Sequence, residues 1–271
     1  MRKVVIVTTG NEVLNGDVLD TNTNWLCKRI TGIGGFVESV ALIRDDAAAI
    51  AREIRAGLAR GAELLITVGG LGPTEDDLTL AAVAQATDRG LVVQPEALAQ
   101  VTRKYAELAA AGAVQDAAMT PTREKMARLP EGAEPLANTV GAAPGVYLRL
   151  NGAAVVSLPG VPAEMRGIFE GSLQPYLRAL FGNSVFVERT VIVESGDESV
   201  LAPILAEVAH QFPATYIKSH AQRFGPDVRF RVTVSQAAAS QAEAEQAIAA
   251  AIQALNDTLS AHGIATQSAT S

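Results

Sequence analysis

A glycine-rich segment with three successive acidic residues marks the first candidate site, at positions 69–79 (GGLGPTEDDLT). Glycines let the backbone approach an anion, and free N–H groups at the start of a helix attract phosphate. The carboxylates would repel a phosphate unless a divalent cation lay between them, and carboxylates with phosphate oxygens are ligands that Mg²⁺ and Mn²⁺ prefer. The segment therefore indicates a metal-assisted phosphate site. The alternative is that Asp76 or Asp77 only caps the following helix.

Other polar segments lie next to predicted strands. Residues 8–12 (TTGNE) follow the first strand, and residues 138–145 and 158–162 flank a predicted hairpin. We expect these segments to wall one crevice, although ordinary turn and capping chemistry would explain each of them alone. Lys125 is one of only five lysines in the chain. A fixed lysine near these acids would serve as a phosphate clamp, although the residues alone favour a solvated surface lysine.

The elements that position these segments alternate between strand and helix. Short strands and amphipathic helices are expected, in turn, at residues 4–7, 21–30, 36–43, 47–60, 64–68 and 78–86. Such alternation predicts a mostly parallel sheet with helices on both faces, which is a three-layer αβα domain. In open sheets of this kind, ligands bind beyond the carboxyl ends of the strands, where the polar segments lie.

The pattern changes after the first 90 residues. Helices are expected at residues 95–111 and 121–127, and a further one runs from Pro162 towards Phe181 with a break or restart at Pro175. The pair Asn151-Gly152 lies between two apolar strands. It predicts a hairpin with a type I′ turn, in which both residues have positive φ.

A domain boundary is expected at residues 182–184, which gives a first domain at 1–182 and a second at 183–271. The second domain is predicted to contain strand, helix, strand, strand and helix, a small α+β pattern that resembles a KH-like fold. Its polar tail at 266–271 is expected to be frayed. No GXXG loop is present and basic residues are few, so interdomain packing or dimerisation is favoured over RNA binding.

Composition restricts the classes of partner and site. The net charge of −7 and the pI near 5.1 argue against nucleic acid or an anionic membrane as the main partner. A single cysteine excludes an intramolecular disulfide and a cysteine zinc site, and all three histidines lie in the second domain. No 18-residue apolar run exists, and the run at 4–7 is too short for a secretion signal, so a cytoplasmic location is expected.

Together, these motifs resemble the competence/damage-inducible CinA family, whose first domain is similar to the molybdopterin-binding domains of molybdenum-cofactor biosynthesis proteins. The resemblance covers nearly the whole chain and rests on residues 9–12, 16, 20–22, 69–79, 138–145 and 158–162. Longer family members carry a C-terminal nicotinamide-nucleotide amidohydrolase domain, which this sequence lacks, so deamidation is not expected. Leu71 and Asp76 stand where related adenylyltransferases have Thr and Arg. The exchange of a cation for an anion favours a metal-dependent site.

The resemblance implies a metal-dependent pyrophosphatase that hydrolyses ADP-ribose to AMP and ribose 5-phosphate, with Mg²⁺, Mn²⁺ or Co²⁺, with K⁺ as an additional ion, and as a homodimer. In this hypothesis Asp76 and Asp77, together with Glu12, hold the metal, and Asp76, Asp77 and Lys125 are catalytic. The expected substrate-binding residues are Gly10, Glu12, Asn22, Gly69, Gly70, Gly72, Pro73, Thr74, Thr79, Asn138, Gly141, Pro144 and Gly145. One alternative is a non-catalytic molybdopterin or nucleotide binder of cofactor metabolism. Another is a regulatory protein with the small domain as its partner surface.

Overall fold

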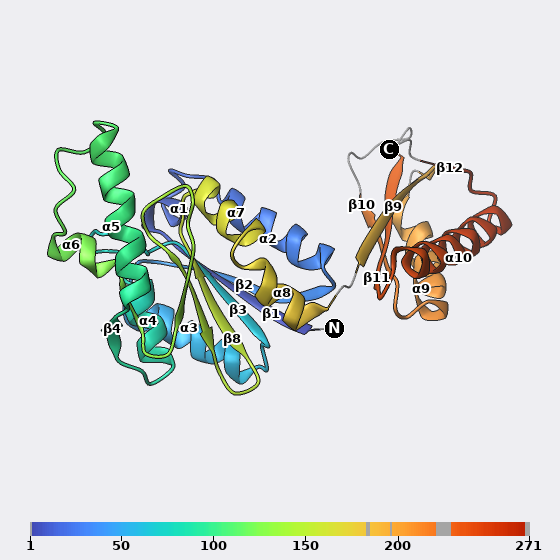
Figure 1. The fold of residues 1–271 in the computed structure, drawn as a ribbon. Helices are drawn as coiled ribbons and strands as arrows, with labels where there is room; N and C mark the ends of the chain where they lie inside the picture. The colour runs from blue at the N-terminus through green and yellow to red at the C-terminus, as the bar shows by residue number, and fades with distance from the viewer. Residues whose placement is uncertain (1, 183–184, 196, 221–228, 269–271) are drawn as a thin grey trace. The chain divides into compact units, whose positions relative to one another are not determined.

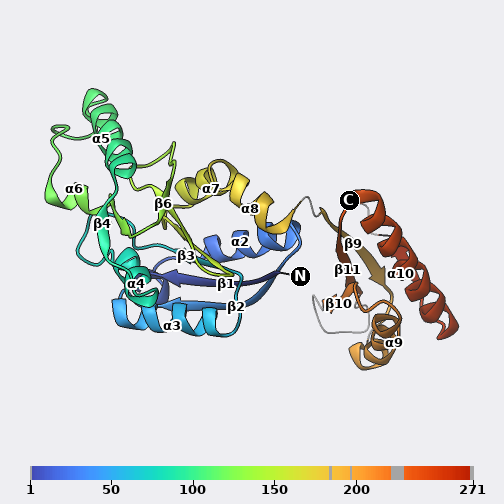
Figure 2. The ribbon, with the colours of Figure 1, turned by 60° about the horizontal axis from the view of Figure 1, so that its bottom comes forward.

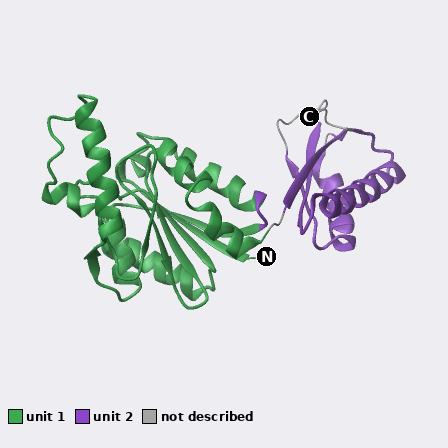
Figure 3. Ribbon diagram, viewed as in Figure 1, with its two compact units in different colours: residues 1–31, 35–182 green, residues 32–34, 183–271 purple. Residues whose placement is uncertain are grey.

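The structure is a computed structural model that describes residues 2–182, 185–195, 197–220 and 229–268. Its internal contacts divide the chain into two compact units (Figure 3). The first unit comprises residues 1–31 and 35–182, and the second comprises residues 32–34 and 183–271. Each unit has its own sheet and its own hydrophobic core.

The first unit is built on a six-stranded sheet. In spatial order its strands are β2 (Gly35–Ile43), β1 (Arg2–Thr9), β3 (Leu64–Val68), β8 (Ala154–Leu158), β7 (Gly145–Arg149) and β6 (Glu134–Leu136). The first four strands run parallel to one another, β7 pairs antiparallel with β8, and the edge strand β6 pairs antiparallel with β7. Strands β3 and β8 are buried along their whole length, as expected for parallel strands that are covered on both faces.

Helices cover both faces of this sheet, which confirms the predicted three-layer α/β architecture. Helices α3 (Ala47–Ala59) and α4 (Thr79–Ala86) lie on one face, and α2 (Thr21–Gly32), α7 (Pro162–Glu170) and α8 (Gln174–Phe181) lie on the other (Figures 1 and 2). Pro175 lies in the first turn of α8, so the proline restarts the helix after a break. The first turn tolerates proline because its N–H has no partner within the helix.

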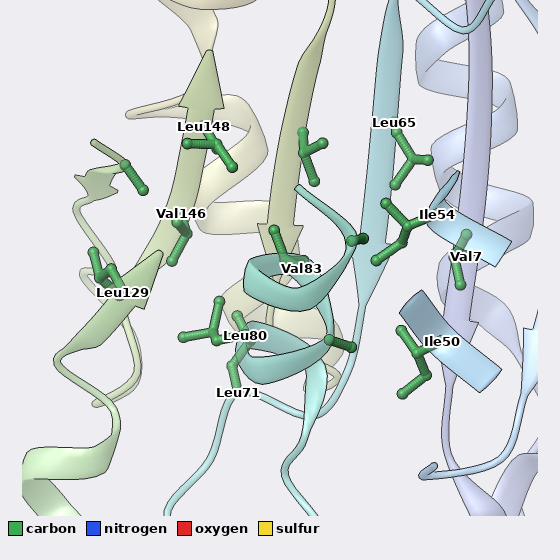
Figure 4. Close-up of a cluster of buried hydrophobic side chains, with 14 of the residues drawn as sticks. Val7, Ile50, Ile54, Leu65, Leu71, Leu80, Val83, Leu129, Val146 and Leu148 are labelled. Carbon is green, nitrogen blue, oxygen red and sulfur yellow. The ribbon is translucent and has the colours of Figure 1, made fainter. Parts of the chain in front are cut away.

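A hydrophobic core of the first unit lies between the sheet and the α3–α4 layer (Figure 4). Val5, Val7 and Leu65 meet Ile50 and Ile54 of α3 there. Successive side chains of a strand point to opposite faces, so the intervening residues of β1 contribute to the other layer. All these side chains are fully buried. Burial on both faces explains why residues 4–7 of β1 are all apolar.

The remaining elements of the first unit lie beside the sheet. They are α1 (Asn11–Leu14), β4 (Leu91–Val93), α5 (Pro95–Ala110), α6 (Pro121–Lys125) and β5 (Arg128–Pro130). Strands β4 and β5 pair antiparallel, and α5 contacts α6. The Gln94 side chain accepts hydrogen bonds from Glu96 N and Ala97 N and so caps α5.

The predicted hairpin is present, but its turn differs from the prediction. Strands β7 and β8 pair with Arg149 opposite Ala154, and Leu150 N donates to Ala153 O at 2.8 Å. Gly152 has a φ of 80°, whereas Asn151 is not among the described residues with positive φ. A type I′ turn needs positive φ at both residues. Because only the glycine takes this conformation, the type I′ assignment is wrong.

The second unit is a small α+β domain with a four-stranded antiparallel sheet. The strand order is β10 (Tyr216–His220), β11 (Phe230–Ala238), β9 (Val185–Val193) and β12 (Thr266–Ser268). The helices are α9 (Glu198–Gln211) and α10 (Gln241–Ala261). Helix α10 contacts β9, β11 and α9, and Val191, Val232, Ile248 and Leu255 contribute to their common core.

The end of the chain corrects one expectation. Thr266–Ser268 forms strand β12 and pairs with β9, with Thr266 opposite Val193, so this part of the expected frayed tail is ordered by backbone pairing. Polar side chains do not prevent such pairing, because an edge strand offers free N–H and C=O groups to any backbone. The last three residues of that tail lie outside the described part of the chain. No helix within the described ranges is long and apolar enough to span a membrane.

Candidate functional site

A cleft of about 590 Å³ opens at the carboxyl ends of the four parallel strands. Segments that follow β1, β2, β3 and β8 line it, together with residues from α5 and from the loop before β7. The structure thus brings together the polar segments that the sequence analysis assigns to one crevice. The lining residues are Thr9, Gly10, Glu12, Asp45, Gly69, Gly70, Leu71, Gly72, Pro73, Thr74, Asp76, Asp77, Tyr105, Met126, Ala142, Ala143, Pro159, Gly160, Val161, Pro162 and Glu164.

The glycine loop after β3 is fixed from behind by Thr79. Gly69 and Gly70 have φ values of 97° and 68°, a region that glycine enters without a steric penalty. Thr79 is fully buried. Its Oγ1 donates to Gly69 O at 2.7 Å, and its N–H donates to Gly70 O at 3.2 Å. Thr79 was expected to contact substrate, but it does not line the cleft; its side chain shapes the loop.

The loop presents backbone donors to the cleft. Gly70, Leu71 and Gly72 line the cleft, and their N–H groups have no acceptor within the described part of the chain. The Leu71 side chain is 4% exposed and packs in the core between the sheet and the α3–α4 layer. This packing anchors the loop. Successive backbone N–H groups without a protein acceptor are donors that an anion can bind.

Asp76 and Asp77 share one hydroxyl group. Asp77 Oδ2 accepts hydrogen bonds from Thr74 N at 2.9 Å and from Thr74 Oγ1 at 2.6 Å, and Asp76 Oδ1 also lies within hydrogen-bond distance of Thr74 Oγ1. The hydroxyl has one proton, so it can donate to only one of these carboxylates at a time. The hydrogen bond from Thr74 is the main cause that lowers the pKa of Asp76, and Lys125 contributes. This hydrogen bond therefore favours the charged, acceptor form of Asp76.

Two acidic residues of the cleft are missed by the sequence analysis. Asp45 follows β2, and Glu164 lies in the first turn of α7. Burial raises the pKa of Asp45, and the negative charges of Glu12, Asp76 and Asp77 raise it further, against a hydrogen bond from Asn11 N. The signal for Asp45 was available, since it follows a parallel strand, as do the other segments at this edge. Glu164 lies two residues after the segment 158–162, which the sequence analysis had already selected.

The cleft has five lining carboxylates and, among the described residues that line it, no lysine or arginine. The carboxylates belong to Glu12, Asp45, Asp76, Asp77 and Glu164. Lys125 was expected to clamp phosphate, but it does not line the cleft. Its Nζ donates to the carbonyl of Thr74, so the ammonium group holds the glycine loop at its outer end. The charged side chains that line the cleft are therefore all acidic, with Lys125 beside them at the outer end of the loop.

The other expected binding residues lie around the cleft rather than in its lining. Asn22 lines an adjoining cavity of about 90 Å³ that shares Thr9, Glu12 and Gly160 with the cleft, and its Nδ2 donates to Gly160 O at 2.7 Å. Asn138 and Gly141 belong to the turn before β7, next to the lining residues Ala142 and Ala143. Pro144 and Gly145 follow this turn, and the backbone of Gly145 packs closely on Ile168.

The expected metal ligands are not gathered into one closed group. Among the described residues, no three or more His, Cys, Asp or Glu side chains are placed to hold a metal ion together. The pair Asp76 and Asp77 nevertheless suits Mg²⁺, which usually binds one or two protein carboxylates, several waters and substrate phosphate oxygens. Because the Thr74 hydroxyl donates to one carboxylate at a time, the other carboxylate receives no hydrogen bond from it. The residues therefore fit a divalent cation that binds together with substrate.

Comparison with known proteins identifies the family. Residues 5–179 match the model of a probable molybdopterin-binding domain. A protein of Aeropyrum pernix is 43% identical over 243 residues (89% of this chain and 88% of that protein), and one of Pyrobaculum calidifontis is 40% identical over 256 residues (94% and 95%). The crystal structure of the protein CinA, of unknown function, from Thermoplasma acidophilum matches with a TM-score of 0.59 and 32% identity, over 65% of this chain and 99% of that one. The chain therefore belongs to the probable molybdopterin-binding domain family and is CinA-like.

Proposed function

We propose that this protein is a metal-dependent pyrophosphatase of nucleoside-diphosphate-linked substrates, with ADP-ribose hydrolysed to AMP and ribose 5-phosphate. One observation carries the proposal: among the described residues, a single cleft combines backbone N–H groups that have no acceptor with five carboxylates, and its lining includes no lysine or arginine. The N–H groups suit phosphate oxygens, whereas the carboxylates repel them. A divalent cation between carboxylate and phosphate resolves this conflict.

Within this proposal each part of the loop has a role. Asp76 and Asp77 would hold the cation, with Glu12 facing the same cleft. A bound divalent cation polarises a phosphoryl oxygen and lowers the pKa of bound water. The N–H groups of residues 70–72 orient the diphosphate. Water adds to one phosphorus atom, the bridging P–O bond breaks, and AMP and ribose 5-phosphate leave.

Two residues act on the loop rather than on the substrate. Thr79 fixes the carbonyl of Gly69 from the buried side, and Lys125 holds the carbonyl of Thr74 from the outer side. The loop is thereby held before substrate arrives, and preorganised donors are worth more than donors that must be ordered during the reaction. The homodimer expected from the family resemblance stays a prediction.

The second candidate function is a non-catalytic binder of molybdopterin or a nucleotide phosphate in cofactor metabolism. The match to the molybdopterin-binding domain model favours it. The same cleft and the same N–H groups would bind the phosphate. The two candidates differ in one measurable property, because the binder forms a stable complex without turnover.

The test is hydrolysis of ADP-ribose, FAD, NAD and diadenosine polyphosphates by the purified protein with EDTA, Mg²⁺, Mn²⁺ or Co²⁺, followed by chromatography. We expect metal-dependent release of AMP. Asp76→Asn should lower the rate at least tenfold at limiting metal, and less so when the metal is saturating. Glu75→Gln is the matched control, because Glu75 is an exposed acid of the same loop that does not line the cleft. Absence of turnover with every metal, in folded protein, would refute the pyrophosphatase and favour the binder.

A further inference from the structure

Glu164 lies in a setting built around its carboxylate. Asn138 Nδ2 donates to Glu164 Oε2 at 2.7 Å and to Ala143 O at 2.8 Å. The Asn138 Oδ1 accepts hydrogen bonds from Val140 N at 3.0 Å and from Gly141 N at 2.9 Å. All the hydrogen-bonding atoms of the Asn138 amide therefore point at fixed partners. The amide orients the glutamate as well as the turn before β7.

Gly141 leaves the space that this carboxylate occupies. A Cβ at position 141 would collide with the Oε1, Oε2 and Cδ atoms of Glu164. The φ of Gly141 is not positive, so the backbone itself would accept another residue. The absence of a side chain at this position is thus required by the position of Glu164 and not by the turn.

One oxygen of this carboxylate is available to a ligand. Glu164 lines the cleft, and no partner of its Oε1 is found among the described residues. A charged carboxylate oxygen accepts hydrogen bonds and donates none. It therefore attracts O–H or N–H groups of a ligand and repels phosphate oxygens.

Glu164 lies apart from the acids around the glycine loop. Glu12, Asp45 and the pair Asp76 and Asp77 follow β1, β2 and β3, whereas Glu164 lies in α7, which follows β8. The cleft residues close to Glu164 in the chain are Val161 and Pro162, and the turn that Asn138 organises contributes Ala142 and Ala143. This wall is apolar apart from the single carboxylate, which suits an uncharged part of a ligand.

We infer that Glu164 binds the neutral hydrogen-bond donors of the ligand, in the nucleoside or sugar part, and that Asn138 is its positioning residue. The inference rests on the proposal that the cleft takes a nucleotide-type ligand, but it requires binding and not turnover. Ribose hydroxyl groups and a base amino group are both neutral hydrogen-bond donors. The glycine loop binds the phosphate at one side of the cleft, and Glu164 selects the nucleoside or sugar that is attached to the phosphate.

The test is calorimetric binding of AMP, 2′,3′-dideoxy-AMP, IMP and inorganic pyrophosphate in the presence of Mg²⁺. Glu164→Gln turns the free acceptor into an N–H donor when Asn138 keeps its bond to the remaining oxygen. Loss of a hydrogen bond to a charged group should weaken AMP binding about 10- to 100-fold. Pyrophosphate, which has no such donor, should bind as before. Dideoxy-AMP lacks the 2′- and 3′-hydroxyl groups of the ribose, and IMP lacks the amino group of the base. The analogue whose affinity does not change in Glu164→Gln therefore lacks the donor that Glu164 binds.

Gly141→Ala supplies a second variant, because it displaces the carboxylate without a change of charge and should reproduce the selective loss. Glu170→Gln is the matched control; Glu170 is an acid of α7 that pairs with Arg29 and does not line the cleft. Equal weakening of AMP and pyrophosphate, no weakening of either, or no binding of AMP by the wild-type protein would each overturn the inference. AMP binding that depends on Glu164 without hydrolysis of any diphosphate would leave the inference standing and refute only the pyrophosphatase.

Discussion

Replacement of Gly70 by alanine is expected to lower the free energy of unfolding of the first unit by about 2–5 kcal/mol. Gly70 has a φ of 68°, where an L residue costs about 1–2 kcal/mol. A Cβ at this position would collide with Thr79 Oγ1. Thr79 would then have to move, and its hydrogen bond to the buried Gly69 carbonyl would be lost. An unpaired buried polar group costs about 1–3 kcal/mol.

The matched control is Gly61→Ala. Gly61 has a similar φ of 86°, but a Cβ there would meet nothing within 4 Å. Its substitution therefore carries the backbone penalty alone, about 1–2 kcal/mol. The difference between the two variants measures what the contact between Thr79 and the loop contributes.

Urea unfolding followed by tryptophan fluorescence is the suitable assay. Trp25 is the only tryptophan in the chain and lies in α2, so its signal reports the first unit. If Gly70→Ala and Gly61→Ala lower the free energy of unfolding equally, within about 0.5 kcal/mol, Thr79 is not the residue that fixes the loop. Differences smaller than this are within the scatter of independent substitutions. A larger loss for Gly70→Ala together with weaker pyrophosphate binding would link loop geometry to anion binding.

Two further predictions concern single side chains. Thr79→Val keeps the shape but removes the hydroxyl, so it should destabilise the first unit by about 1–3 kcal/mol in the same urea assay; an unchanged midpoint would show that the buried bond to Gly69 contributes nothing. Burial, followed by the hydrogen bond to Glu134, raises the pKa of Tyr176 to about 12. A tyrosine ionisation near this pH should therefore appear in absorbance at 295 nm and should be missing in Tyr176→Phe. Because the folded pKa of Tyr176 is higher than the unfolded one, its contribution to the free energy of unfolding is present below about pH 10 and is lost as the pH rises through about 12. An absorbance titration curve that Tyr176→Phe leaves unchanged would contradict the prediction.

The sequence determined the layers of the first unit because each element carries its own periodicity. The apolar run at residues 4–7 is buried on both faces, as its lack of alternation indicates. Helix α3 begins after Asp46, whose carboxylate accepts a hydrogen bond from Ala49 N at 2.7 Å. The glycine loop and the acids that follow it were also apparent, since the rule that ligands bind at the carboxyl ends of parallel strands needs only strand order.

Tertiary structure alone decided what each of these side chains does. Thr79, Asn138 and Lys125 have the polar groups of ligand-binding residues, yet their donors are used on Gly69, Glu164 and Thr74. Glu164 enters the cleft because a turn far from it in the sequence supplies a donor and leaves a space. A hydrogen bond between residues 26 positions apart leaves no local pattern in the sequence. Residue types and spacing therefore indicated where chemistry takes place, whereas the division between groups that face the cleft and groups that support it follows only from the packed fold.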